Sequence, residues 1–322
     1  MTKSDVLKIM KKAKNVALFA HKNPDPDAYG AMFAMREALA SFGAHADVFA
    51  IRNEKSNLDL IFPLDEVKTK FNAEEYDLCI MLDIFALKRI NPEFVDGLQN
   101  SEKILIIDHH HVGSDEKVAS ENFFIEPEKS ATCEILTDLF TEFKIEITPK
   151  MATYLWAGLI GDTDRFLHNN LSKNVLKTAC ALFEHGADAQ FVYDALFRSV
   201  SMRQLGLNKA FINKLKFLED GKVGYVIFTT KDLKKLDIDR DNLYTLYAEI
   251  VKIQGVEASF FISQIDEKHF KVSVRTKGLD SLKVSHKMGG GGHTCASAFE
   301  CNMRLPEIKR AVHSWAKTII EK

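Results

Sequence analysis

Three short, mostly apolar runs each end on acidic or imidazole side chains, and this feature limits the possible folds more than any other. The runs cover residues 16–20, 77–82 and 103–107, and they are followed by His21, by Asp83 and by the run Asp108, His109, His110 and His111. Runs of this kind are typical of strands buried in a parallel sheet. Residues 28–39 then have the pattern of a helix. Because ligand sites form at the carboxyl ends of parallel strands, we predict an α/β fold with a polar site at that edge.

The loop after the first run carries two carboxylates one residue apart. Its sequence is HKNPDPD, in which Pro24 and Pro26 stand beside Asp25 and Asp27 and stiffen the loop. Two neighbouring carboxylates repel each other unless a cation lies between them, which indicates a metal site. The alternative is a polar surface turn, where Asn, Pro and Asp are ordinary residues. The acidic and imidazole residues that follow the other two runs favour the metal site over the surface turn.

Six side chains are candidate metal ligands, and all of them offer nitrogen or oxygen. They are His21, Asp25, Asp27, Asp83, His109 and Asp162. Such donors favour Mn²⁺ or Mg²⁺ over structural zinc. Six ligands are too many for one catalytic ion with open positions, but they suit two ions that share a bridging carboxylate. A pair of ions roughly 3.5–4 Å apart can hold a hydroxide nucleophile and neutralise a phosphate during in-line displacement.

Several of these candidates have structural alternatives. Asp83 could instead cap the following helix, and His109 could belong to a surface histidine cluster. Asp164 lies two residues after Asp162, and the spacing does not choose between them. Asp108 is expected to orient a neighbouring histidine rather than bind metal.

The rest of the chain predicts more helices and then a second domain. Helices are expected at residues 130–143, with Ser130 as the cap, and at 151–160 and 172–184. Strands at 223–229, 258–265 and 270–275, a charged helical segment at about 240–251 and a helix at 305–320 indicate a smaller mixed α+β domain. We therefore predict a catalytic domain over residues 1–187, a helical linker over 188–220 and a substrate-binding domain over 221–322.

A glycine run in the second domain suggests a phosphate site. Gly289, Gly290, Gly291 and Gly292 precede His293. Glycines let backbone N–H groups approach an anion, and His293 adds a side-chain donor. Arg275 ends a strand shortly before and could hold a phosphate with its planar guanidinium. The alternative is a flexible loop.

Composition excludes several classes of protein. The net charge of −2 over 322 residues gives no global basic field for long nucleic acid, and no apolar run is long enough to cross a membrane. The N-terminal residues lack the apolar core of a signal peptide. Five scattered cysteines without a C-x-x-C pair suit a reducing cytoplasm and do not support thiolate-bound zinc.

These residues together resemble a known family. The segment HKNPDPDA, Asp83, the Asp108–His109–His110 triplet and the segment at Asp162 resemble the four motifs of the DHH phosphoesterases. Arg275 and GGGGH resemble the DHH-associated domain that follows in one branch, and the chain is most similar to the bacterial NrnA-type branch. The resemblance covers about residues 15–299.

The resemblance implies a division of roles. His21, Asp25 and Asp83 would hold one Mn²⁺, and Asp27, Asp83, His109 and Asp162 the other, with Mg²⁺ as an alternative. Asp83, His109 and His110 would form the catalytic centre, with His110 facing the scissile phosphate. Arg275, the glycines Gly290, Gly291 and Gly292, and His293 would bind the substrate's other phosphate from across an interdomain cleft. A homodimer is also implied.

The expected activity is hydrolysis of short oligoribonucleotides, of linear dinucleotides such as pApA, and of 3′-phosphoadenosine-5′-phosphate (pAp). Long duplex nucleic acid and membranes are not expected partners. Alternatives are a hydrolase of cyclic dinucleotides, polyphosphate or pyrophosphate, and a nucleotide sensor without catalysis. The GGGGH segment argues against the pyrophosphatase branch, and six metal donors argue against a sensor. Two positions depart from the family pattern: Asp164 and Ala298 stand where it often has Gly.

Overall fold

The computed structural model describes residues 1–51, 57–113, 117–167 and 170–321. The chain divides into two compact units, Met1–Ser199 and Val200–Lys322, which are described separately. Residues of the predicted linker 188–220 belong partly to each unit: helix α7 (Ala189–Tyr193) to the first and α8 (Met202–Lys214) to the second. The role of this segment as a linker stays a prediction.

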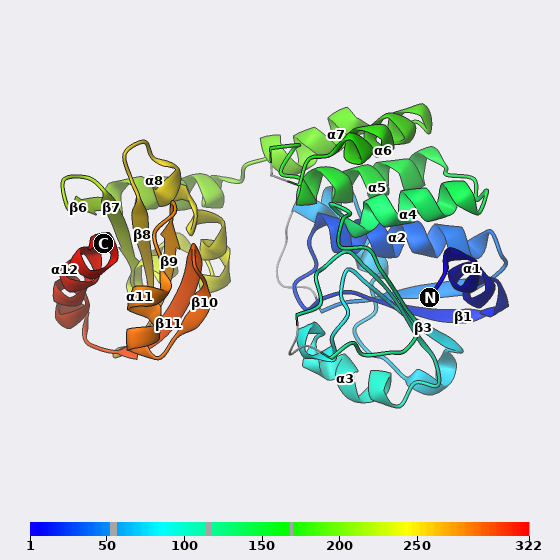
Figure 1. Ribbon diagram of the computed structural model, residues 1–322, viewed down its shortest axis with the longest axis horizontal. Coiled ribbons are helices and arrows are strands. Elements are labelled where there is room, and N and C mark those ends of the chain that lie inside the picture. Colours follow the sequence, from blue (N-terminus) through cyan, green and yellow to red (C-terminus); the bar gives the residue numbers. More distant parts are fainter. Residues whose placement is uncertain (52–56, 114–116, 168–169, 322) are drawn as a thin grey trace. The chain divides into compact units, whose positions relative to one another are not determined.

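A parallel sheet forms the centre of unit 1, as predicted, and it has five strands (Figure 1). Its strands are β1 (Asn15–Phe19), β2 (His45–Phe49), β3 (Leu78–Leu82), β4 (Ile104–Asp108) and β5 (Phe123–Ile125), in the order β2-β1-β3-β4-β5. The three apolar runs are β1, β3 and β4, and Val16 of β1 lies opposite Leu78 of β3. The short strand β5 was not predicted, because it has only three residues.

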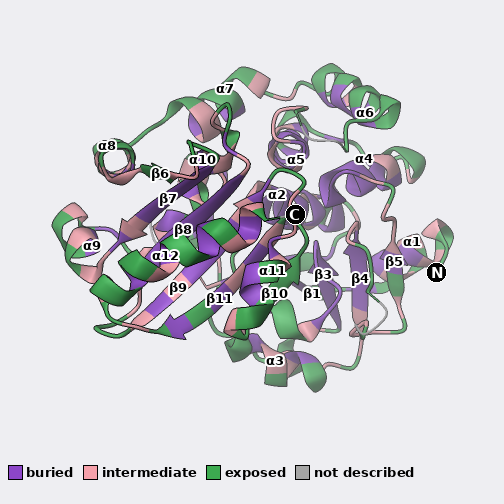
Figure 2. Ribbon diagram, turned by 60° about the vertical axis from the view of Figure 1, so that its left-hand side comes forward, coloured by how far each residue is buried: buried purple, intermediate pink, exposed green. Residues whose placement is uncertain are grey.

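Helices cover both faces of this sheet (Figure 1). On one face lie α1 (Lys3–Lys12), α2 (Pro26–Ala40), α4 (Thr132–Glu142), α5 (Pro149–Asp162) and α6 (Lys173–Glu184); on the other lies α3 (Pro92–Gln99). Successive strand residues face opposite sides, so Leu18 packs in the larger core and Phe19 packs with Phe94 of α3. Both faces are therefore apolar, which explains the continuous apolar runs in the sequence (Figure 2).

Two predicted helix boundaries were wrong. Ser130 does not cap α4, which begins at Thr132; the Ser130 hydroxyl donates to the carbonyl of Asn170 instead. The helix predicted over 151–160 extends to Asp162, so this candidate ligand is the last residue of α5 rather than part of the following loop.

Unit 2 has a six-stranded mixed sheet in the order β10-β11-β9-β8-β7-β6. The strands are β6 (Lys216–Leu218), β7 (Val223–Phe228), β8 (Ala258–Gln264), β9 (His269–Thr276), β10 (Gly291–His293) and β11 (Ala296–Asn302). One core packs the sheet against α11 (Leu282–Ser285) and α12 (Leu305–Ile320), and the other packs it against α8, α9 (Thr230–Leu236) and α10 (Glu249–Lys252). The helix predicted over 240–251 is instead a 3₁₀ helix, Arg240–Leu246, followed by the short α10.

Among the described residues, no helix combines the length and the apolar composition needed to cross a lipid bilayer.

Candidate metal centre

The strand order of unit 1 creates a ligand site at a defined place. From β1 the chain continues to β2 on one side, and it then returns to β3 on the other side of β1. In open α/β sheets such a reversal leaves a crevice at the carboxyl ends of the two central strands. His21 follows β1 closely and Asp83 follows β3 directly, so both side chains start at this crevice.

His21, Asp25 and Asp83 form the first group. Nε2 of His21 lies 3.7 Å from Oδ2 of Asp25 and 3.4 Å from Oδ2 of Asp83. The other oxygen of Asp25 caps α2, because it accepts the N–H groups of Asp27 and Ala28 at 2.9 and 3.1 Å. Donor atoms of these three side chains all lie within 4.8 Å of one another, a suitable spacing for one cation.

Asp27, His109 and Asp162 form the second group, again with donor atoms within 4.8 Å. Asp27 is fully buried, and its two oxygens accept the N–H groups of Thr132 and Cys133 at the start of α4, at 2.7 and 2.9 Å. Nε2 of His109 lies 3.1 Å from Oδ2 of Asp162. The structure therefore brings Asp162 to this group.

His109 has the geometry of a metal ligand. Its Nδ1 lies 3.3 Å from the carbonyl oxygen of Lys129, so Nδ1 carries the proton that this bond needs, and Nε2 keeps its lone pair in the neutral ring. That Nε2 is buried and makes no well-formed hydrogen bond among the described residues, although carboxylate oxygens surround it. A buried lone pair among carboxylates fits a divalent cation.

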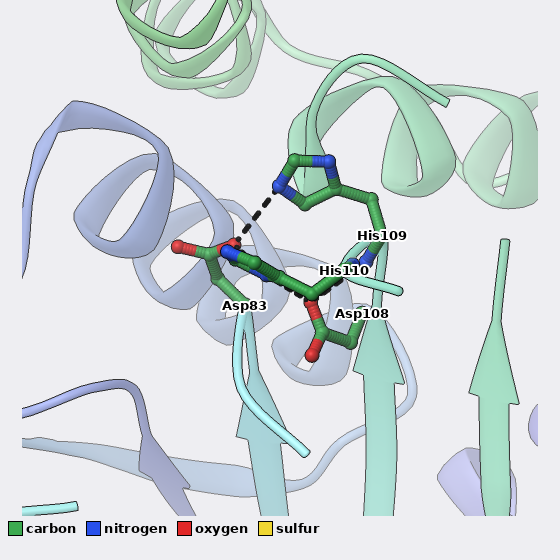
Figure 3. Close-up of side chains that lie close together, drawn as sticks. All are labelled: Asp83, Asp108, His109 and His110. Atoms are coloured by element: carbon green, nitrogen blue, oxygen red, sulfur yellow. Dashed lines mark hydrogen bonds and ion pairs between the residues drawn. The ribbon is translucent and has the colours of Figure 1, made fainter. Parts of the chain in front are cut away.

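His110 faces a different way and is held by Asp108 (Figure 3). Nδ1 of His110 donates to Oδ1 of Asp108 at 2.8 Å, and the same oxygen accepts the backbone N–H groups of His109 and His110. Asp108 is fully buried, whereas 37% of the His110 side chain is exposed. Asp108 thus fixes the ring and leaves Nε2 available to a bound molecule.

Without a cation, the carboxylates of this cluster favour the protonated form of the two neighbouring histidines. Burial by itself would lower the pKa of His21, but the nearby carboxylates of Asp25 and Asp83 outweigh burial and raise the pKa to about 10. Burial is likewise outweighed at His109, where Asp162 and Asp83 raise the pKa to about 11. Burial would raise the pKa of Asp83, but the two histidines, each with Nε2 at 3.4 Å from an Asp83 oxygen, outweigh burial and lower it.

The negative charge of the carboxylates in the second group is not fully balanced. Burial, followed by repulsion from Asp162 and Asp83, raises the pKa of Asp27 well above its usual range. Burial and the carboxylates of Asp25 and Asp83 raise the pKa of Asp162 to about 6. Carboxylates in such surroundings need positive charge from another source, which a cation supplies.

Asp164, which departs from the expected family pattern two residues after Asp162, lies in a segment with an unusual backbone conformation. Asp164, Arg165 and Phe166 all have positive φ, with 42° at Asp164. Glycine adopts this conformation without a steric penalty, which is a physical reason for the Gly that the resemblance leads us to expect at this position. In this chain the Asp164 carboxylate accepts from Nε of Arg165 at 3.0 Å, and the Arg165 guanidinium lies over the Phe197 ring. Asp164 is therefore engaged with Arg165 and is not in the second group.

In unit 2 the sheet aligns Arg275 with His293. Arg275 of β9 pairs with Ala296 of β11, and Ala296 pairs with His293 of the edge strand β10, so the three residues form one row across adjacent strands. Nη1 of the half-buried Arg275 donates to the carbonyl of Val274 at 2.9 Å, and burial lowers its pKa. Gly291–His293 form a strand, so only part of the glycine run is a loop.

At two positions of this run a larger residue would clash or be strained. A Cβ on Gly290 would lie 2.2 Å from the carbonyl oxygen of Ala298, and Gly292 has φ 138°. Nothing lies within 4 Å of a Cβ built on Gly291. The second departure, Ala298, lies opposite Gly291 in the β10–β11 pair, where the missing side chain leaves room for its methyl group.

Sequence reasoning missed the residues that support Asp27. The N–H groups of Thr132 and Cys133 gave no sequence signal, because any residue can supply a backbone N–H. Gly158 of α5 packs against this region, and a Cβ there would lie 2.6 Å from Oδ1 of Asp27. A glycine inside a predicted helix was the one available signal.

Comparison with known proteins decides the family. Residues 15–159 match the DHH family, N-terminal domain, and residues 220–318 match the DHHA1 domain. The chain belongs to the DHH family. The resemblance seen in the sequence is thereby confirmed, and this DHH family chain is a phosphoesterase.

Full-length relatives support this assignment. The chain is similar to the bifunctional oligoribonuclease and PAP phosphatase NrnA of Bacillus subtilis (strain 168), with 26% identity over 299 residues, which cover 92% of each chain. Among solved structures, an exopolyphosphatase-related protein from Bacteroides fragilis matches 98% of this chain and 95% of its own, with a TM-score of 0.84 and 21% identity. RecJ in complex with Mn²⁺ from Thermus thermophilus matches with a TM-score of 0.51 and 14% identity; the match covers 98% of this chain but 54% of RecJ. The last two similarities show the shared fold.

Proposed function

We propose that the DHH unit holds two divalent cations that share Asp83. The observation that carries this proposal is the position of the Asp83 carboxylate between the two groups: Oδ2 lies 3.4 Å from Nε2 of His21, and Oδ1 lies 3.4 Å from Nε2 of His109. Each oxygen can thus serve a different cation. His21 and Asp25 complete one ligand set, and Asp27, His109 and Asp162 complete the other.

Mn²⁺ is the proposed cation, with Mg²⁺ as the second choice. The donors are imidazole nitrogens and carboxylate oxygens without sulfur, which suits both ions, and imidazole favours Mn²⁺ over Mg²⁺. The related RecJ binds Mn²⁺. When bound, such a pair of ions activates water and neutralises the phosphate charge.

Residues of this chain would position the phosphate. His110, which Asp108 orients and whose side chain is 37% exposed, would offer its Nε2 to a phosphate bound at the crevice. The hydrogen bond to Asp108 raises the pKa of His110, which favours the protonated ring as a donor to a phosphate oxygen. Asp108→Asn should therefore lower kcat about 10- to 100-fold while both cations stay bound, because Asp108 orients the His110 ring and is not itself a proposed metal ligand. Loss of cations from that variant would contradict a purely orienting role.

The proposed substrates are very short oligoribonucleotides, linear dinucleotides such as pApA, and pAp. Relatives that align over nearly the whole chain are named for both activities. Arg275 and His293 lie in one row of the unit 2 sheet and offer two cationic or donor groups for a second phosphate. We also propose that the enzyme works in the cytoplasm, where its free cysteines stay reduced, and as a homodimer.

Other hydrolase reactions remain as a second candidate. Polyphosphate is suggested by the name of the Bacteroides relative, but that similarity is one of fold. The DHHA1 match to residues 220–318 and the row formed by Arg275 and His293 favour the oligoribonuclease and pAp phosphatase branch.

A turnover panel with Mn²⁺ tests this choice. It compares pAp, pApA, a pentanucleotide RNA, cyclic di-AMP and pyrophosphate, with wild type and Asp83→Asn. Asn is the suitable replacement because Asp83 has φ 60°, which Asn tolerates better than Ala. The expected result is hydrolysis of pAp and the linear substrates, abolished in the variant. Preference for pyrophosphate, or near-normal turnover by Asp83→Asn, would contradict the proposal.

A further inference from the structure

The two units carry opposite net charges that the whole-chain value conceals. Unit 1 has 22 Lys and Arg against 31 Asp and Glu, a net charge of −9, and unit 2 has 21 against 14, a net charge of +7. A domain with this positive excess attracts polyanions, provided that its cations gather on one surface.

Helix α12 of unit 2 gathers such cations. These cations are Lys309, Arg310 and Lys317, which are exposed, and the exposed imidazole of His313 lies among them. At 100° per residue these four positions lie within an arc of about 100° on the helix surface. The buried residues of α12 occupy the adjoining arc and pack into the unit core; they are Ile308, Val312, Trp315, Ala316 and Ile319. In Figure 2 exposed and buried stretches alternate along α12.

Lys283 of α11 extends this surface. Its Nζ donates to the backbone carbonyl of Glu321 at 2.9 Å, which ties α11 to the end of α12. We call Lys283, Lys309, Arg310, His313 and Lys317 the basic face. In the described part of the chain, no carboxylate lies within ion-pair distance of its lysines or Arg310. The acidic residues of α12 lie near its two ends: Glu307 accepts the N–H of Arg304 at the first turn, and Glu321 follows the last turn.

We infer that the basic face binds the phosphodiester backbone of single-stranded RNA. Exposed cations at repeated positions, without aromatic side chains among them, suit contact with phosphates rather than with bases. A membrane surface is a poorer partner, because the apolar side of α12 is buried in the core and cannot insert into lipid. The inference deepens the proposed function, on which it rests for the choice of RNA: the face would hold RNA longer than the segment that is cleaved.

Fluorescence anisotropy in EDTA tests the inference independently of catalysis. The probe is a fluorescein-labelled single-stranded RNA of about 12 nucleotides, titrated at several salt concentrations. The test variant carries Lys309→Ala, Arg310→Ala and Lys317→Ala. The matched control carries Lys231→Ala, Lys234→Ala and Lys235→Ala, which removes the same charge from exposed positions of α9 in the same unit.

The test variant should bind RNA at least tenfold more weakly at low salt. Its slope of log K against log salt should fall by about 2, since each phosphate contact to a single strand contributes about 0.7. The control variant should keep most of the affinity and the slope. Equal losses of RNA affinity in the two variants would mean that the net positive charge of unit 2, and not the basic face, is responsible for binding, and would overturn the inference. RNA binding absent from wild type, or binding to anionic lipid vesicles that the test variant loses, would also overturn it.

Turnover of pApA, measured separately with Mn²⁺, distinguishes this inference from the proposed function. The test variant should retain that turnover, because the inference assigns the basic face to longer RNA and not to the dinucleotide. A wild-type protein that binds the longer RNA but hydrolyses none of the substrates would contradict the proposed function alone.

Discussion

Cation binding should raise the melting temperature of unit 1 in steps that follow the two ligand groups. A ligand at about 100 times its Kd adds about 2.7 kcal/mol to the free energy of unfolding, so two independent ions add about 5.4 kcal/mol. For a unit of the size of Met1–Ser199, 1 kcal/mol moves Tm by roughly 2–4 °C. Wild type should therefore melt roughly 10–20 °C higher with saturating Mn²⁺ than with EDTA.

Two variants separate the contributions of the ions. Asp25→Asn removes a ligand of the first group alone, and Asn keeps the oxygen that caps α2, so about half of the Mn²⁺-dependent rise should remain. Asp83→Asn removes the shared ligand and should lose nearly all of it. Asp96→Asn, an exposed position on α3, is the matched control and should behave as wild type.

Differential scanning calorimetry with metal analysis of the purified proteins provides the measurement. Comparing each variant with its own EDTA sample removes any effect of the substitution on the metal-free fold. A rise in Asp83→Asn as large as that of wild type would refute the shared-carboxylate arrangement. A wild-type rise of less than a few degrees would refute the two-cation site itself.

Four further substitutions test the packing around Asp27, the glycine run and Arg275. Gly158→Ala should prevent stable Mn²⁺ binding at the second group, measured by metal analysis, because the new methyl would displace the Asp27 carboxylate 2.6 Å away; full occupancy would contradict this. Gly290→Ala should lower the free energy of unfolding of unit 2 by about 1–3 kcal/mol in thermal unfolding. Gly291→Ala is the control, because nothing lies within 4 Å of its new methyl group, and it should cost less than about 0.5 kcal/mol. Equal losses would count against the close approach of β10 to β11. Arg275→Ala should raise KM for pAp and pApA more than it affects an aryl phosphate, and equal effects in steady-state kinetics would argue against a role in phosphate binding.

The amino-acid sequence by itself determined the type of sheet and the chemistry of the site. Continuous apolar runs can be satisfied only where both faces of a strand are covered, so the parallel α/β unit followed from residues 16–20, 77–82 and 103–107. The polar residues after each run then had to lie at one edge of that sheet. Their identity as imidazole and carboxylate also indicated a cation without sulfur ligands.

Only the tertiary structure decided which carboxylates meet. Asp162 and Asp164 were equivalent in the sequence, but α5 extends to Asp162 and brings it to His109, while Asp164 pairs with Arg165. Likewise, the position of Asp83 between His21 and His109 depends on strand order, which local sequence does not encode. These outcomes arise from contacts between segments far apart in the chain, where packing of α2 against α5 and the reversal between β1 and β3 fix the positions of the side chains.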